Sequence, residues 1–108
     1  MLLLKELPST ESLFYDEDFH RMLVKHFPYF IENNLFEPRD ISGSTAEIYK
    51  GDFYGVLLNL GIPFEFHRIN TEFNMLLSPL DYKGEAGPIR IIVSKELNRL
   101  NNIYKTRT

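Results

Sequence analysis

Residues 44–77 constrain the fold of this chain most, because the spacing of apolar residues changes twice within them. Over residues 45–60, apolar side chains recur at helical intervals, and Gly51-Asp52 is a point where the helix can break. Residues 64–69 begin with apolar and polar residues in alternation, which is typical of a half-buried strand. The spacing over residues 70–77 fits a second strand or a short helix. This stretch therefore predicts a helical layer next to part of a sheet.

The remaining segments also mix helix and strand patterns. Carboxylates at residues 16–18 favour a helix N-terminus, and apolar residues follow at spacings of three and four through Phe27. Residues 35–45 are predicted to be irregular, because a residue before proline avoids the helical region. Ile89–Val93 is dominated by β-branched residues and is the clearest strand. A last helix is expected over residues 94–104, with Ser94 as its cap.

Length and composition favour one small domain. A chain of 108 residues with 44% apolar residues can bury a single core. The chain contains no cysteine, so neither a disulfide framework nor thiolate chemistry is expected. We predict an α+β fold over residues 1–108, in which helices pack on a short antiparallel sheet that includes residues 64–69 and 89–93.

The charge of the chain excludes several classes of partner. The formal net charge is −3, whereas proteins that bind nucleic acids need basic surface to neutralise phosphates. The same charge argues against an anionic membrane surface. The apolar run Met1–Leu4 is too short for a signal peptide or a membrane span. We therefore expect no nucleic acid and no membrane as partners, and a location in a virion or the cytoplasm rather than secretion.

The residue types that carry catalysis or bind metals are poorly placed in this sequence. His20 and His26 are six residues apart, so on one helix they point roughly 120° away from each other. His67 is expected on a strand as a surface or interface residue. Ser42-Gly43-Ser44 lacks the lysine and the glycine spacing of a phosphate-binding loop. We therefore expect no metal, no cofactor and no enzymatic activity.

Aromatic residues and an apolar N-terminal arm indicate a protein interface. The chain has nine Phe and six Tyr, and some of these rings should remain at the surface of so small a domain. Residues 1–8 form an arm whose leucines would each forfeit about 1.5–3 kcal/mol of burial in water. The alternative for the arm is that it folds back on its own domain, and the alternative for the rings at 49–54 is the core. The predicted interface residues are Leu2, Leu3, Leu4, Leu7, Tyr49, Phe53, Tyr54 and Tyr82.

The middle of the chain carries a family pattern. Ser42-Gly43-Ser44-Thr45 forms a turn-like start, and the helix patterns of Thr45–Tyr49 and Tyr54–Leu58 follow it. Ile89–Val93 stands where a closing strand would be. Residues 42–93 thus resemble a LysM-like module, and they are similar to the LysM-like part of baseplate wedge subunits in tailed phages. The resemblance implies two central helices on a small sheet.

Three functions remain compatible with these observations. The first is a non-enzymatic structural or adaptor subunit of a larger protein assembly, with a phage tail or baseplate component as the leading case. Such a subunit would contact other protein subunits and would be present in multiple copies in a symmetric particle. The second is the glycan binding that LysM-like modules imply, in which Tyr49, Tyr54 or Tyr82 would stack on sugar rings. The third is a small cytosolic inhibitor of a host protein.

Overall fold

A computed structural model describes residues 16–107 as six α-helices packed on a two-stranded antiparallel sheet. The predicted α+β class is therefore confirmed. Two short 3₁₀ turns flank helix α6 in the sequence. In chain order the elements are α2 (Glu17–Lys25), α3 (Phe27–Glu32), β1 (Phe36–Ile41), α4 (Gly43–Ile48), α5 (Phe53–Asn59), η3 (Phe64–Phe66), α6 (His67–Phe73), η4 (Pro79–Asp81), β2 (Gly87–Ile92) and α7 (Ser94–Arg107).

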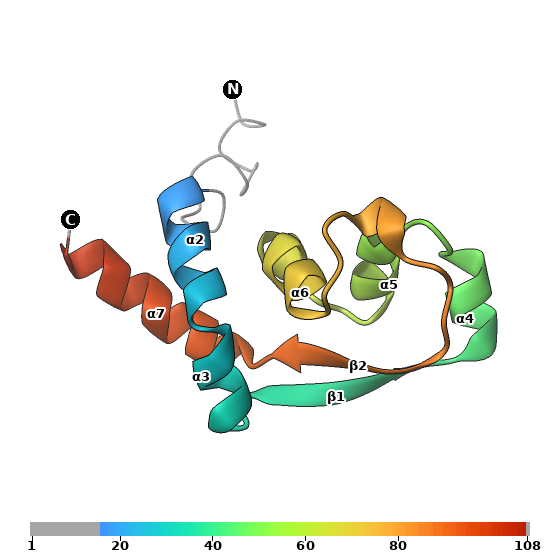
Figure 1. Ribbon diagram of the computed structural model, residues 1–108, viewed down its shortest axis with the longest axis horizontal. Coiled ribbons are helices and arrows are strands. Elements are labelled where there is room, and N and C mark those ends of the chain that lie inside the picture. Colours follow the sequence, from blue (N-terminus) through green and yellow to red (C-terminus); the bar gives the residue numbers. More distant parts are fainter. Residues whose placement is uncertain (1–15, 108) are drawn as a thin grey trace.

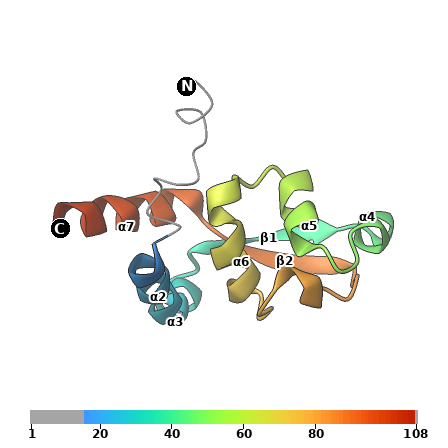
Figure 2. The ribbon, with the colours of Figure 1, turned by 90° about the horizontal axis from the view of Figure 1, so that it is seen from above.

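The two strands form a ribbon along one side of the molecule, and helices cover it from the other side. Figure 1 shows α5 and α6 over the ribbon, α2, α3 and α7 gathered at one end, and α4 at the opposite end. The view from above in Figure 2 keeps the same order of elements along the ribbon. Strands β1 and β2 are joined by about 45 residues of chain that hold α4, α5 and α6, so helices α5 and α6 are placed on the sheet by the connection itself.

Helix α6 closes the outer edge of β2 with two asparagine side chains. Asn70 Oδ1 accepts the Ile92 N–H at 2.8 Å. Asn74 Oδ1 accepts the Arg90 N–H at 2.9 Å, and Asn74 Nδ2 donates to the Arg90 carbonyl oxygen at 2.8 Å. The two amides lie one helical turn apart and occupy the positions that a third strand would fill. Backbone groups that would otherwise template aggregation are thus satisfied within the domain.

The outer edge of β1 is protected by its sequence instead. In the register, Pro38 lies opposite Arg90. Because the backbone groups of Arg90 point away from β1 towards Asn74, Pro38 occupies the matching outward-facing position on β1. A proline there removes the N–H that another strand would need. Exposed Glu37 and Asp40 add charge to the same strand, so β1 is a poor edge for strand addition.

The prediction of a strand over residues 64–69 is wrong. This segment forms η3 and the start of α6 instead. Phe64 and Phe66 alternate with polar residues because they lie in a turn, in which the first ring is exposed and the second is buried. The helical period of α6 is hidden in the sequence, because much of its buried face is polar and escapes a search for apolar residues. The polar residues of that face are His67, Asn70 and Thr71.

The prediction that residues 35–45 are irregular is also wrong, because they include β1 and the start of α4. Burial along β1 does not alternate, and a proline stands in its middle, so neither sign of a strand is present in the sequence. Pairing with β2 defines this strand. Other predictions for elements hold: β2 overlaps the predicted strand, Gly51-Asp52 separates α4 from α5, and Asp16 caps α2. The last helix is present as α7, but Ser94 is its first residue and not its cap, since the Leu97 N–H donates to the Val93 carbonyl oxygen. Helix α3 had no separate prediction.

Candidate interaction surface

The predicted interface residues do not gather on one surface. Leu2, Leu3, Leu4 and Leu7 lie outside the described residues. Phe53 and Tyr82 belong to the core, with 1% and 6% of their surface exposed, so their assignment to a surface was wrong. Their rings pack with centroids 5.3 Å apart, and the Tyr82 hydroxyl donates to the Glu85 carbonyl oxygen at 2.8 Å. Burial also raises the pKa of Tyr82. Tyr49 and Tyr54 are half-buried.

A different surface carries the most exposed apolar side chains. A groove of about 460 Å³ opens between α3 and the segment that follows α6. Its floor contains Phe27 and Phe73, whose rings meet edge to face with centroids 5.0 Å apart. Arg90 and Glu72 contribute its charged atoms. The residues that line the groove are Val24, Phe27, Ile31, Glu72, Phe73, Met75, Leu76, Leu77 and Arg90.

Met75 and Leu77 project almost completely into solvent beside this groove. Each has 93% of its surface exposed, the highest values among the large apolar residues described. Ile31, on the opposite wall, is 45% exposed. Single exposed apolar residues are common on proteins, but here three of them adjoin one apolar floor. Such a surface is typical of a site that another molecule covers.

The backbone at Met75 is in a conformation that favours glycine. Its φ is +68°, in the left-handed region. It follows the last turn of α6, where the Met75 N–H donates to the Glu72 carbonyl oxygen at 2.9 Å. The next N–H, of Leu76, donates to the Thr71 carbonyl oxygen at 3.1 Å. This pair of hydrogen bonds is the Schellman motif, whose left-handed residue is usually glycine because a Cβ there adds strain.

Two other helices of the chain end in the same motif with residues that tolerate it. Gly61 follows α5 at φ +83° and Asn34 follows α3 at φ +54°, each with the same pair of closing hydrogen bonds. Glycine and asparagine visit the left-handed region at little cost, whereas an unbranched apolar residue does not. A methionine at position 75 therefore serves neither the left-handed backbone conformation nor the packing of the core. A strained and exposed position of this kind indicates a role outside folding.

We expect Met75→Gly to raise the free energy of unfolding by about 0.5–1 kcal/mol. Relief of left-handed strain contributes about 1–2 kcal/mol, and the greater flexibility of glycine in the unfolded chain offsets about 0.5–1 kcal/mol of that. Urea unfolding followed by circular dichroism measures the change. Asn34→Gly is the matched control and should change stability less, because asparagine already tolerates the conformation. A clear loss of stability in Met75→Gly would show that the methionine side chain supports the fold.

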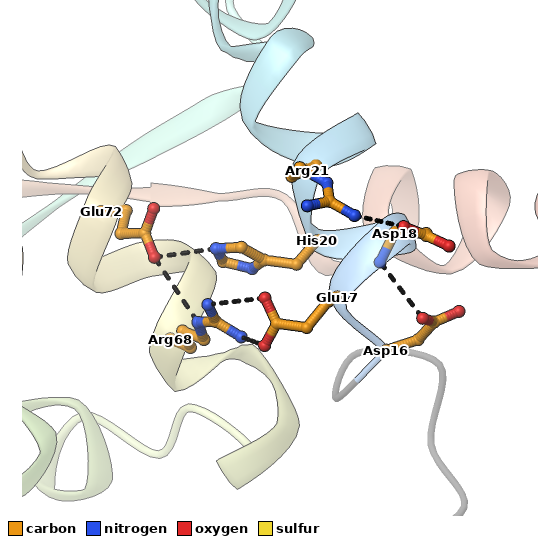
Figure 3. Close-up of polar contacts among 7 residues, drawn as sticks. All are labelled: Asp16, Glu17, Asp18, His20, Arg21, Arg68 and Glu72. Atoms are coloured by element: carbon orange, nitrogen blue, oxygen red, sulfur yellow. Dashed lines mark hydrogen bonds and ion pairs between the residues drawn. The ribbon is translucent and has the colours of Figure 1, made fainter.

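A cluster of charged side chains holds α2 against α6, two helices that each contribute side chains to the lining of the groove. Arg68 donates to both carboxylate oxygens of Glu17, at 2.7 and 3.2 Å, and this contact lowers the pKa of Glu17. His20 Nε2 lies 2.8 Å from Glu72 Oε2, and Arg68 Nε lies 3.6 Å from the same oxygen. Figure 3 shows these side chains meeting between the two helices. His20 is buried, so its contact with Glu72 is shielded from solvent and more constraining than a surface pair.

Glu72 connects this cluster to the groove. It is the residue of the cluster that also lines the groove, and Val24 lies further along α2, on the groove side. The first turn of α2 is therefore tied to α6, and next to this junction Phe27 packs on Phe73. The polar contacts therefore lie directly beside the apolar side chains of the groove. Among residues 16–107, no group of three or more metal-binding side chains converges.

His67 lies apart from the groove and is fully packed. Only 1% of its surface is exposed, and its ring contacts the rings of Tyr54 and Phe64. Nε2 lies 2.8 Å from the Ile62 carbonyl oxygen, which can only accept, so Nε2 carries the proton. Nδ1 is buried without a hydrogen-bond partner within the described part of the chain. Burial lowers the pKa of His67, against a smaller opposite effect of the bond to Ile62.

We expect the domain to lose stability as the pH falls through about 6.5, the ordinary pKa of histidine. Above that pH, His67 is neutral in the folded and unfolded chains and contributes nothing. Below it, the unfolded chain binds a proton that the folded chain, with its lowered pKa, does not, at a cost of up to about 1.4 kcal/mol per pH unit. Urea unfolding at pH 7.5 and 5.5 measures the change. His67→Gln keeps a donor for Ile62 and should flatten this dependence; an equally steep dependence would assign it to other groups.

A second hollow, of about 590 Å³, lies where α2 and α3 meet α7. Its apolar residues are better covered than those of the groove: Ile103 and Tyr29 are each 42% exposed. Lys25 and Arg99 also line it, and Arg99 is ion-paired with Glu96. The most exposed apolar side chains of the described residues therefore lie beside the groove near Met75 and not in this hollow. None of the helices in the described range 16–107 is both long and apolar enough to cross a membrane.

Comparison with known proteins identifies no relative of this chain. No protein-family model matches the chain, and no curated protein or solved structure shows significant similarity to it. The function of the chain is therefore inferred from the geometry of the groove, from Met75 and from the surrounding charges.

The sequence offered one usable signal for this site. Met75-Leu76-Leu77 is an apolar run that ends before Ser78-Pro79, a pair that is typical of a break between elements. An apolar run that leaves a helix and enters a loop is a candidate for exposure. The predicted interface residues were chosen among aromatic side chains instead, because aromatic residues are enriched at protein interfaces in general. The left-handed backbone at Met75 has no signal in the sequence.

Proposed function

We propose that this chain is a non-enzymatic structural or adaptor subunit of a larger protein assembly, and that it binds a neighbouring subunit through the groove beside Met75. The single observation that carries the proposal is Met75 itself, which is 93% exposed at a φ of +68°. A residue that strains the backbone and packs on nothing is explained by contact with a partner. Methionine is well suited to that contact, because its flexible side chain adapts to a facing surface.

The leading case for the assembly is the tail or baseplate of a tailed phage, with several copies in a symmetric particle. The order of elements supports the resemblance to LysM-like modules that underlies this choice. Ser42 caps α4 immediately after β1, α5 follows, and β2 closes a two-stranded sheet with β1. The departure from the family pattern is the long stretch between α5 and β2, which here holds η3, α6 and η4. The proposed contact surface lies largely in that added stretch.

Binding of glycans is less well supported. Tyr82 is buried in the core, and Tyr49 and Tyr54 are half-buried, so the tyrosines proposed to stack on sugars present little open ring surface. Stacking on a sugar needs an accessible aromatic face. The exposed residues beside the groove are aliphatic, which favours a protein partner.

The proposed function is tested by purifying native particles from the source of this chain. Quantitative mass spectrometry should find the chain in a fixed small-integer ratio to the other structural subunits, after washing in high salt. The apolar contact should resist salt, because screening weakens exposed charge pairs but leaves apolar burial intact. Recovery of the chain only in the soluble fraction, or in trace amounts on particles, would contradict the proposal.

A further inference from the structure

Among the arginines of residues 16–105, Arg90 is the one whose guanidinium has no carboxylate partner. Arg21, Arg39, Arg68 and Arg99 each lie within ion-pairing distance of an aspartate or glutamate. Within residues 16–105, Arg90 makes no such pair, although its side chain lines the groove. The arginine without an ion pair is therefore the one that lies beside the most exposed apolar residues.

The guanidinium of Arg90 is held in place by an aromatic ring. Its central carbon lies 5.2 Å from the centroid of the Phe36 ring. The backbone of Arg90 is fixed by its two hydrogen bonds with Asn74, within a strand that pairs with β1. A guanidinium that rests on a ring keeps the donors of its edge free, and these match the two oxygens of a carboxylate. The side chain is thus oriented before any ligand arrives.

Glu72, the other charged residue that lines the groove, does not pair with Arg90. Glu72 is already engaged by His20 and Arg68 on its far side. The free charge of the groove is therefore positive, in a chain whose net charge is −3. A complementary ligand is apolar where it meets Met75 and Leu77, and negative where it meets Arg90.

We infer that the groove receives a segment of another protein that carries apolar side chains next to one carboxylate, and that this carboxylate pairs with Arg90. The inference rests on the proposed function and names the chemistry of its partner. An extended or helical segment fits better than a small molecule, because Met75 and Leu77 flank the groove without enclosing it. The apolar contacts supply affinity, and the ion pair sets the direction in which the segment lies.

The test uses a displayed library of random twelve-residue peptides, selected in parallel on the full-length chain and on Arg90→Glu. The wild-type chain should enrich peptides with two or three apolar residues beside an aspartate or glutamate. The Arg90→Glu chain should enrich apolar peptides with lysine or arginine at that place instead. For a peptide selected on the wild type, Arg90→Gln should weaken binding about tenfold, and high salt should reduce this difference.

The outcomes separate this inference from the proposed function. If both chains enrich the same apolar peptides without preference for charge, the groove binds protein but the role of Arg90 is wrong. If selected peptides bind Leu77→Asp as well as wild type, they do not use the groove, and both proposals fail. Nuclear Overhauser contacts between the Met75 methyl and leucines of residues 1–8 in the free chain would show that the chain fills its own groove, and would overturn an external partner.

Discussion

Replacing Asn70 with leucine is expected to lower the free energy of unfolding by about 3 kcal/mol, since a buried N–H left without a partner costs about 1–3 kcal/mol and a second bond is lost with it. The side chain is fully buried and bonds in two directions. Oδ1 accepts the Ile92 N–H of β2, and Nδ2 donates to the Phe66 carbonyl oxygen at the start of α6. Leucine has the same branching and the same number of non-hydrogen atoms, so the change removes the hydrogen bonds while the shape of the side chain is largely kept, and its larger methyl groups add to the loss.

Urea unfolding of the full-length variant measures this effect. Asn98→Leu is the matched control, because Asn98 is an exposed asparagine on α7. Its substitution should change stability by less than about 0.5 kcal/mol. Equal stabilities for Asn70→Leu and the wild type would mean that the outer edge of β2 does not depend on this asparagine, and the account of how α6 joins the sheet would be wrong.

Replacing Leu77 with aspartate is expected to abolish association with the neighbouring subunit, by at least about a hundredfold, since a charge in an apolar contact costs several kcal/mol. The same change should leave the free energy of unfolding nearly unaltered, because 93% of Leu77 is exposed in the free domain. Competition between tagged wild-type and variant chains for incorporation into particles gives the ratio directly.

Leu58→Asp is the control for this experiment. Leu58 is an exposed leucine on α5, with 57% of its surface accessible, and it does not line the groove. Its substitution adds the same charge to a different surface and should leave incorporation unchanged. An equal defect in both variants would trace the loss to net charge or folding, and normal incorporation of Leu77→Asp would remove the groove from the interface.

The elements that could be predicted from the sequence are those whose signals are local. Asp16 accepts the N–H of Asp18 and caps α2, as an acidic helix start requires. The β-branched run at 89–93 overlaps β2, and Gly51-Asp52 breaks the helical pattern where α4 ends. Each of these signals acts within a few residues of chain, so no knowledge of the tertiary contacts is needed.

The elements that could not be predicted depend on contacts distant in sequence. Strand β1 is defined by a partner about 50 residues away, and its own residues do not alternate. Helix α6 buries Asn70 because the edge of β2 needs its amide, so a polar residue occupies a core position. The groove escaped prediction for a related reason: the exposure of Met75 follows from how α6 ends, which only the backbone conformation reveals.

The most direct test of the central claim is the rate at which Met75 is oxidised by dilute hydrogen peroxide, in the free chain and in the purified assembly. Met75 is 93% exposed, whereas Met22 is half-buried and serves as an internal reference. Peptide mass spectrometry resolves the two sulfoxides. We predict rapid oxidation of Met75 in the free chain and at least tenfold protection in the assembly, with little change at Met22. Equal rates for Met75 in both states would contradict the claim that the groove beside it is the contact surface.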